Sequence, residues 1–213
     1  LFVKDLATGK AFSDVVENIE ANIVWADDNQ TLFYIEKDPI TLLSKRVKSH
    51  VLGDANHLDN LVYEEADDSF YMGISRTRSE QYICITVEST VSSEQHFALA
   101  NNPTKFTVIA ERERDIEYSA DHLNNRWVIR TNWNAPNYKL MTLGDCETMG
   151  SRSDWRDFIE HKSDVFIEGF ELFNLFIAIE ERSNALLRIR TLSNDGKQAF
   201  VASDEAAYTM DLN

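Results

Sequence analysis

The chain is poor in cysteine, proline and glycine. Its 213 residues include two cysteines, Cys84 and Cys146, which lie far apart and outside any paired-cysteine motif. This spacing argues against a disulfide framework and predicts a reducing compartment, the cytoplasm. Cys84 stands within an apolar segment and is expected to be a small buried core residue. With only three prolines and seven glycines, and no low-complexity linker, we expect a single domain over 1–213.

Long apolar runs and basic residues are also missing. No apolar run reaches the ~18 residues that a membrane span needs, so we expect neither a membrane span nor a signal peptide. The chain carries 36 acidic and 21 basic side chains, a formal net charge of −15. This balance predicts neither a nucleic-acid partner nor a membrane partner, because phosphates require a basic patch. It favours cationic ligands only weakly, because solubility alone is the stronger explanation of an acidic surface.

Motifs for catalysis and metal binding are absent too. No Gly-x-Ser-x-Gly occurs, and the segment Gly73–Thr77 fails that pattern at its last position. Five histidines are scattered without metal-ligand spacing, and His122 beside Asp121 is expected to make a structural hydrogen bond. The five are His50, His57, His96, His122 and His161. The sequence therefore predicts no catalytic, cofactor-binding or metal-binding residue and no cofactor.

Acidic residues gather in three places, at 64–68, 111–115 and 180–181. The first group lacks the alternating ligands and the glycine of a calcium loop. Arginines interleave with the acids near residues 111–115 and 180–182 and partly neutralise them. We therefore expect solvated loops with salt bridges at all three places.

The segment Asp164–Arg190 carries the strongest pattern in the chain. It contains two apolar runs of strand length, Val165–Phe173 and Leu175–Ile179, followed by the alternating run Leu187–Arg190. Because Leu175–Ile179 is apolar at every position, we expect this strand to be covered on both faces. In a chain without crossover helices, this pattern predicts sheets stacked face to face.

The second strand of this unit recurs along the chain. Its relatives are Thr31–Ile35, Gln81–Ile85, Arg126–Arg130 and Asn174–Ala178. The steps between their starts are 81 − 31 = 50, 126 − 81 = 45 and 174 − 126 = 48 residues. Four short strands every ~40–50 residues are typical of a β-propeller blade. A β-sandwich is the alternative, but it has no reason to repeat a four-strand unit.

The repeat predicts an all-β, partial propeller of about four blades at residues 13–66, 67–114, 115–163 and 164–203. We expect Leu1–Phe12 to supply an outer strand of a preceding blade. One helical turn is expected at Ser13–Glu20, with Ser13 or Asp14 as its cap, and another at Asp154–Ile159. Trp155 and Phe158 are expected to anchor the irregular insert Gly144–Asp157. Both ends would then cut through blades, as in an internal fragment of a longer protein.

Four ordered segments add a resemblance to a known family. Val24–Gly53, Leu61–Thr77, Asp115–Asn132 and Glu168–Arg182 resemble the propeller of the oligopeptidase B group within the prolyl oligopeptidase family of serine peptidases. The resemblance implies a seven-bladed propeller placed over an α/β-hydrolase domain, its partner within the parent chain. It also implies cleavage of short basic peptides after Arg or Lys by a Ser-Asp-His triad in that domain.

The resemblance further implies that the propeller gates access to the catalytic domain and is inactive alone. A non-enzymatic propeller that serves as an interaction scaffold is the alternative. An open arc of blades would expose apolar faces at its ends, so we expect the fragment to self-associate or to be marginally stable.

Overall fold

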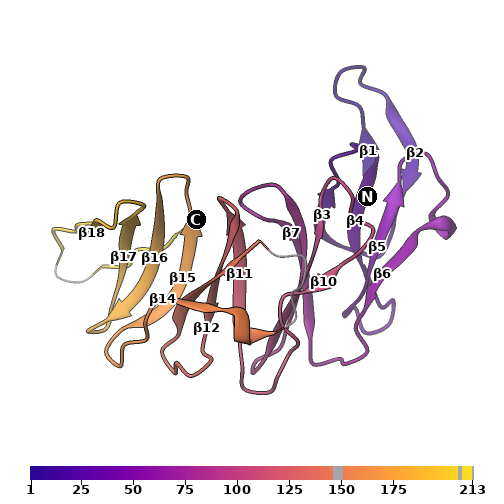
Figure 1. Ribbon diagram of the computed structural model, residues 1–213. Helices are drawn as coiled ribbons and strands as arrows, with labels where there is room; N and C mark the ends of the chain where they lie inside the picture. The colour runs from indigo at the N-terminus through magenta and orange to yellow at the C-terminus, as the bar shows by residue number, and fades with distance from the viewer. Residues whose placement is uncertain (146–150, 206–207, 213) are drawn as a thin grey trace. The chain divides into compact units, whose positions relative to one another are not determined.

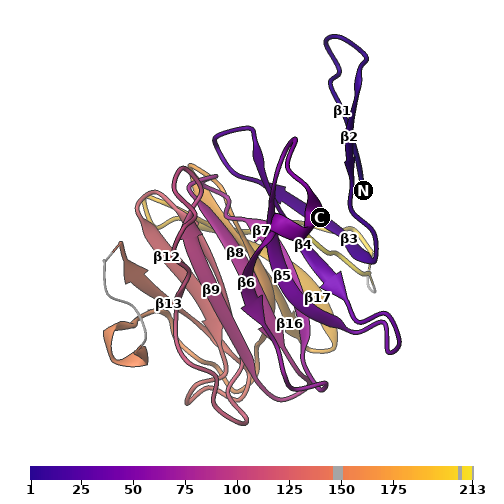
Figure 2. The ribbon, with the colours of Figure 1, turned by 90° about the vertical axis from the view of Figure 1, so that its right-hand side faces the viewer.

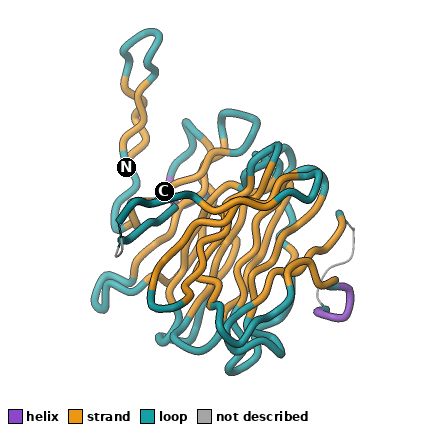
Figure 3. The backbone as a smooth tube through the Cα atoms, turned by 90° about the vertical axis from the view of Figure 1, so that its left-hand side faces the viewer, coloured by secondary structure: helices purple, strands orange, loops and turns teal. Residues whose placement is uncertain are grey.

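The computed structural model describes residues 1–145, 151–205 and 208–212. Within these ranges, nearly all regular structure is β-strand (Figure 3). The described strands form four sheets of four strands and one sheet of two. They divide into two compact units, which are described separately: unit 1 holds residues 1–90 and 94–109, and unit 2 holds residues 91–93 and the described residues from 110 onward.

Unit 1 contains the two-stranded hairpin and two four-stranded sheets (Figure 1). The hairpin consists of β1 (Phe2–Lys4) and β2 (Ala11–Val15). The first sheet consists of β3 (Ile19–Trp25), β4 (Thr31–Lys37), β5 (Ser44–Val51) and β6 (Asn60–Glu64), with the 3₁₀ turn η1 (Asn56–Leu58) before β6. The second consists of β7 (Tyr71–Arg76), β8 (Tyr82–Glu88), β9 (Ser93–Leu99) and β10 (Thr107–Val108).

Unit 2 contains the other two four-stranded sheets. One consists of β11 (Tyr118–Leu123), β12 (Arg126–Thr131), β13 (Lys139–Gly144) and β14 (Arg156–Ile159), with the 3₁₀ turn η2 (Arg152–Asp154) before β14. The other consists of β15 (Phe166–Leu172), β16 (Phe176–Ser183), β17 (Leu186–Ser193) and β18 (Gln198–Phe200). No helix in the described ranges has the length and apolar character needed to cross a bilayer.

Each four-stranded sheet is a simple antiparallel meander, in which strands adjacent in sequence are also hydrogen-bonded neighbours. The predicted repeat of a four-strand unit is therefore confirmed. The second strands begin at Thr31, Tyr82, Arg126 and Phe176, within two residues of the positions expected from the repeat. Ile, Val and Phe in these strands fit a pleated and buried surface, which is why the pattern could be detected without an alignment.

Each unit has an apolar core that its two sheets share. In unit 1 the core is built around fully or almost fully buried side chains of the second strands, including Phe33, Ile35, Ile83 and Ile85. In unit 2 the equivalent residues are Val128, Ile177 and Ile179, and Leu140 of the third strand β13 joins them in the core. These strands are buried on both faces, as predicted for the apolar run at 175–179, except at its first residue. Leu175 is 75% exposed because it lies in the turn before β16.

Both expected helical turns are wrong. Ser13–Glu20 instead contains the end of β2 and the start of β3, because Asp14 turns its carboxylate into a buried cluster and does not cap a helix. At 154–159, a 3₁₀ turn ends at Asp154 and strand β14 begins at Arg156. The Ser151 hydroxyl accepts a hydrogen bond from the N–H of Ser153, so the polar side chains stabilise the shorter turn.

The turn between β11 and β12 contains only two residues. Strand β11 continues to Leu123, and only Asn124 and Asn125 connect it to β12. Both asparagines have positive φ, 54° and 58°, which is the conformation of a two-residue type I′ hairpin turn. Asparagine tolerates this region of the backbone map, so two residues suffice and the strand gains length.

The β1–β2 hairpin is attached to the first sheet of unit 1 at its base, and its tip extends away from that sheet (Figure 2). The amino group of Leu1 donates to the carbonyl of Val16 at 2.6 Å. Val16 packs with Leu32 and Tyr34 of β4 in a small apolar cluster. At the tip, Leu6 is 91% exposed. At the base, the carboxylate of Asp14 in β2 lies 3.0 Å from Nε2 of His50 in β5, which holds the hairpin to the first sheet.

Candidate functional site

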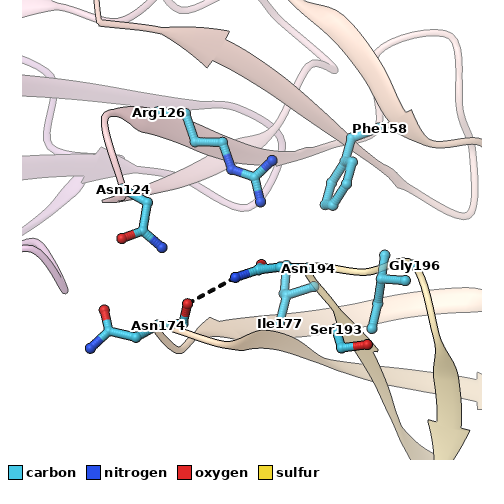
Figure 4. Close-up of a pocket in the computed structure, with 9 residues that line it drawn as sticks. Asn124, Arg126, Phe158, Asn174, Ile177, Ser193, Asn194 and Gly196 are labelled. Atoms are coloured by element: carbon cyan, nitrogen blue, oxygen red, sulfur yellow. Dashed lines mark hydrogen bonds between the residues drawn. The ribbon is translucent and has the colours of Figure 1, made fainter.

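Unit 2 contains an open cleft of about 640 Å³ between its two sheets (Figure 4). Turns contribute most of its polar groups, because the hairpin turns of both sheets end beside it. The lining consists of Asn124, Arg126, Phe158, Asn174, Ile177, Leu192, Ser193, Asn194 and Gly196. Arg126 is the only charged residue in this lining, although the chain as a whole is strongly acidic.

The Arg126 guanidinium is held by an aromatic ring and has no acidic partner. Its central carbon lies 5.1 Å from the centre of the Phe158 ring, a cation–π contact. Figure 4 shows the guanidinium between Asn124 and Phe158, facing Asn194. Within the described residues, Arg126 makes no ion pair and its side chain donates no hydrogen bond. Its donors therefore remain available to a ligand.

The three asparagines of the cleft differ in whether their side-chain amides have hydrogen-bond partners. The Asn194 side-chain amide donates to the carbonyl of Asn174 at 2.9 Å, and the Asn194 N–H donates to the carbonyl of Leu175 at 3.1 Å. These bonds fix the turn after β17 against the turn before β16. The side-chain amides of Asn124 and Asn174 have no protein partner in the described part of the chain. The cleft thus combines one cation, two available amides and an apolar floor that includes Ile177, which is 4% exposed.

Unit 1 contains a different cluster, in which His50 of β5 lies between two carboxylates. Its Nδ1 is 2.7 Å from Asp59 Oδ1 and its Nε2 is 3.0 Å from Asp14 Oδ1. The side chains of His50, Asp59 and Asp14 are 0%, 1% and 2% exposed. Tyr34 donates its hydroxyl to Asp59 at 2.7 Å, and the N–H of Gly53 donates to Asp14 at 2.6 Å. Because Asp14 belongs to β2, this cluster ties the hairpin to the first sheet.

The surroundings of the cluster shift the pKa values of its members. Burial alone would lower the pKa of His50, but its hydrogen bonds with Asp59 and Asp14 outweigh burial and raise it above the ordinary value. The N–H of Gly53, followed by the ring of His50, holds the pKa of the Asp14 carboxyl below its ordinary value. Burial, together with the hydrogen bond to Asp59, raises the pKa of Tyr34. The two carboxylates therefore favour the protonated form of His50.

This cluster stabilises structure and does not suit catalysis. Both ring nitrogens of His50 are occupied by carboxylates, and the ring is inaccessible to solvent. A general base must reach the substrate proton directly or through one water. The sequence pattern missed the cluster because Asp14 lies 36 residues before His50, on another sheet. The only signal in the sequence is a histidine, His50, within a segment of strand length.

The other histidines are dispersed, as the sequence suggested. His122 is fully buried and its Nε2 lies 2.8 Å from Asp145, which agrees with the expected structural role. His96 lies 2.7 Å from Glu94, and His57 is exposed in η1. Cys84 is buried, as expected, whereas Cys146 lies outside the described residues. No group of three or more potential metal ligands occurs among the residues described.

Two of the carboxylates that were expected in solvated loops are buried. Glu65 is 3% exposed and accepts hydrogen bonds from the Tyr63 hydroxyl and the N–H of Asp67. Glu181 is also 3% exposed and forms ion pairs with Arg190 at 2.9 Å and Arg188 at 3.1 Å. The prediction of solvated positions is wrong for these two residues, because hydrogen bonds and ion pairs compensate the burial of their carboxylates. The anchoring role of Trp155, in contrast, is confirmed: it is 4% exposed and packs edge-on against Tyr118.

Comparison with known protein families identifies the fold. Residues 1–212 match the family described as prolyl oligopeptidase, N-terminal β-propeller domain. The chain belongs to the prolyl oligopeptidase family. Its four-stranded sheets are blades of that propeller, and the sequence prediction of the family and of the all-β partial propeller is confirmed.

Curated relatives and solved structures agree with this assignment. The chain is 56% identical to dipeptidyl aminopeptidase BI of Pseudoxanthomonas mexicana, over 99% of this chain and 29% of that protein. It is 28% identical to Protease 2 of Moraxella lacunata, over 99% of this chain and 30% of that protein. The structure of oligopeptidase B from Leishmania major superposes with a TM-score of 0.87 and 26% identity, over 97% of this chain and 30% of that one. The chain thus spans under a third of the length of these relatives.

Proposed function

We propose that this propeller segment gates the active site of a peptidase of the prolyl oligopeptidase family and performs no catalysis itself. The family match over residues 1–212 carries the proposal. The peptidase relatives are more than three times longer than this chain, which leaves room for a catalytic domain elsewhere in the parent protein. In such an arrangement the propeller would admit short peptides and exclude folded proteins, a gating role.

The first experiment tests where catalysis resides. The full-length protein and the 213-residue segment are treated separately with a fluorophosphonate that labels activated serines. We expect one labelled serine in the full-length protein, outside these residues, and no label in the segment. Label within the segment would refute the division of roles. Absence of label from an intact, folded full-length protein would favour the non-enzymatic scaffold.

A second experiment tests the gate. The full-length protein is assayed with a series of peptides of increasing length that share one cleavage site, and with a folded protein that carries the same site in a loop. We expect kcat/KM to fall steeply with length and the folded protein to resist cleavage. Equal cleavage of the short peptides and the folded protein would contradict gating while leaving peptidase activity intact.

Two substrate preferences are supported by different observations. The net charge of −15 suits peptides with basic residues and agrees with the cleavage after Arg or Lys proposed from the family resemblance. The 56% identity to a protein named dipeptidyl aminopeptidase supports release of dipeptides from a free amino terminus. Four chromogenic dipeptide amides, with Arg or Leu at the cleaved position and a free or blocked amino terminus, distinguish these preferences. Loss of activity on blocking favours the second, whereas loss on changing Arg to Leu favours the first.

We also propose that the 213-residue segment self-associates when it is produced alone. Phe2 and Leu6 of the β1–β2 hairpin are 80% and 91% exposed, and Phe200 of β18 is 50% exposed. Large apolar side chains at such positions favour association. Sedimentation velocity should show a concentration-dependent rise in mass, reduced by Phe2→Ser together with Leu6→Ser. A monodisperse monomer at high concentration would contradict this proposal.

A further inference from the structure

The cleft beside Arg126 has the composition of a ligand site. Arg126 is the single charged lining residue, and in the described residues no acid pairs with it, although acids outnumber bases by 36 to 21 in the chain. The other arginines in the strands of unit 2 donate hydrogen bonds to described acceptors. Arg182 pairs with Glu168 at 2.7 Å, and Arg190 pairs with Glu181 at 2.9 Å. Arg130 and Arg156 have no acidic partner, but they donate to backbone carbonyls. Only the N–H groups of Arg126 have no acceptor among the described residues, and an external anion would supply one.

The geometry of the guanidinium suits a carboxylate. The central carbon of the guanidinium lies 5.1 Å from the centre of the Phe158 ring, and no described acceptor takes the N–H donors that lie in the guanidinium plane. The planar fork of donors matches the two oxygens of a carboxylate in a bidentate pair. A phosphate dianion would need additional positive charge, and no second cation lines the cleft.

The rest of the cleft matches a peptide attached to that carboxylate. The side-chain amides of Asn124 and Asn174 offer both donors and acceptors, which are the complement of peptide N–H and C=O groups. Ile177 and Leu192 provide an apolar surface for a side chain. The volume of about 640 Å³ lies within the range of small-ligand sites and accommodates a few residues.

We propose that this cleft binds the carboxyl-terminal end of a short peptide, with the terminal carboxylate paired to Arg126 and the preceding peptide groups on Asn124 and Asn174. The binding is independent of the peptidase activity proposed above, because all the groups that take part belong to unit 2 of this chain. If the parent is a peptidase, the ligand class is that of its products, each of which acquires a free carboxylate when a peptide bond is cleaved.

The test compares N-acetyl-dialanine with its carboxamide by isothermal titration calorimetry on the full-length protein, with mass spectrometry to verify that each probe stays intact. Hydrogen bonds to a charged group are stronger than neutral ones, so the acid is expected to bind about tenfold more tightly than the amide or better. Arg126→Gln should abolish this difference. The matched control, Arg182→Gln, removes an exposed arginine of β16 in the other sheet of unit 2 and should leave the difference unchanged.

Two further variants guard against misfolding and separate the parts of the site. Arg126→Lys keeps the positive charge and the aliphatic stem but loses the bidentate fork, so it should retain part of the preference for the acid. Asn174→Ala should weaken the acid and the amide equally, because this side chain is assigned to the peptide group. Thermal melts of each variant verify that the fold is intact.

Three outcomes would overturn the proposal. The first is equal affinity for acid and amide, or no binding of either at concentrations of about 10 mM. The second is a preference for the acid that survives Arg126→Gln. The third is inorganic phosphate that binds more tightly than N-acetyl-dialanine and displaces it, which would assign the cleft to free oxyanions and not to peptides. None of these results changes the expected outcome of the fluorophosphonate experiment. The proposal of peptide binding in the cleft and the proposal of catalysis outside this segment are therefore tested separately.

Discussion

The buried cluster around His50 predicts a large and specific loss of stability when the histidine is replaced. Below pH ~6.5, where the raised pKa keeps His50 protonated, His50→Gln removes the positive charge between Asp14 and Asp59, whose side chains are 2% and 1% exposed. Glutamine has a similar length and retains one hydrogen-bonding end. Because glutamine is neutral, it cannot balance the charge of the two carboxylates. At least one buried negative charge therefore loses its compensation.

The magnitude follows from the burial of all three groups. Removing one member of a buried ion pair costs about 3–5 kcal/mol, because the remaining charge stays desolvated. Tyr34 and Gly53 still donate to the carboxylates, at 2.7 Å and 2.6 Å, and they reduce the loss. We therefore expect His50→Gln to lower the free energy of unfolding of unit 1 by about 3 kcal/mol. His57→Gln, at an exposed position of η1, is the matched control and should stay within about 0.5 kcal/mol.

The assay must report on unit 1 alone, because two compact units need not unfold together. Trp25 is the one tryptophan of unit 1, whereas Trp127, Trp133 and Trp155 belong to unit 2. Urea titration of 5-fluorotryptophan-labelled protein, followed by ¹⁹F NMR, therefore separates the two transitions. The Trp25 midpoint should fall in His50→Gln. A loss below about 1 kcal/mol, or an equal shift of the unit 2 signals, would refute the reasoning.

The same cluster predicts how stability depends on pH. The folded-state pKa of His50 is raised, so its contribution is fully present below the unfolded value of about 6.5 and is lost as pH rises through the higher folded value. The pKa of Asp14 is lowered, so its contribution is present above about 3.9 and is lost as pH falls through the lower folded value. Unit 1 should be most stable between these limits. In His50→Gln the decline on the alkaline side should disappear; a wild-type alkaline limb that persists in the variant would contradict the assignment.

Three other substitutions test unit 2 by the same fluorine signals. Glu181→Gln leaves Arg188 and Arg190 without their buried partner and should cost about 3 kcal/mol or more; a loss under 1 kcal/mol would show that the pair is solvated. Arg130→Met removes a guanidinium 3.5 Å from the centre of the Tyr138 ring and its 2.8 Å bond to the carbonyl of Ile167, and should cost about 2–3 kcal/mol, with Arg130→Lys giving only partial recovery. Leu175→Asn should change stability by less than about 0.5 kcal/mol, whereas a larger loss would place Leu175 in the core.

The strands could be predicted from sequence because their signal is local. Runs such as Thr31–Lys37 and Arg126–Thr131 carry β-branched and aromatic residues over strand length, and the repeat reinforces each of them. The errors lie where a side chain has a distant partner. Asp14 resembled a helix cap because its partner His50 lies 36 residues away. Leu175 resembled a buried residue because periodicity alone does not locate the end of a turn.

The candidate cleft could not be predicted from the sequence, for a related reason. Its lining comes from turns and strands between residues 124 and 196, and none of these residues forms a motif. The sequence shows that acids outnumber bases, but it does not single out Arg126. Only the structure shows which arginines have acceptors for their N–H groups.

The net charge of −15 overstates the field that a ligand would meet. Asp14, Asp59, Glu65 and Glu181 are buried, and each is held by a histidine, a tyrosine or an arginine. These acids stabilise the blades and contribute little to attraction at the surface. The exposed acids can still steer basic peptides over about one Debye length, an effect that salt weakens. The bidentate contact of Arg126 acts at hydrogen-bond distance and attracts a negatively charged carboxylate. A peptide with basic side chains and a free carboxyl terminus would be attracted by the exposed acids and bound by Arg126. Raising the salt concentration should therefore slow its association more than it weakens the preference for the carboxylate over the carboxamide.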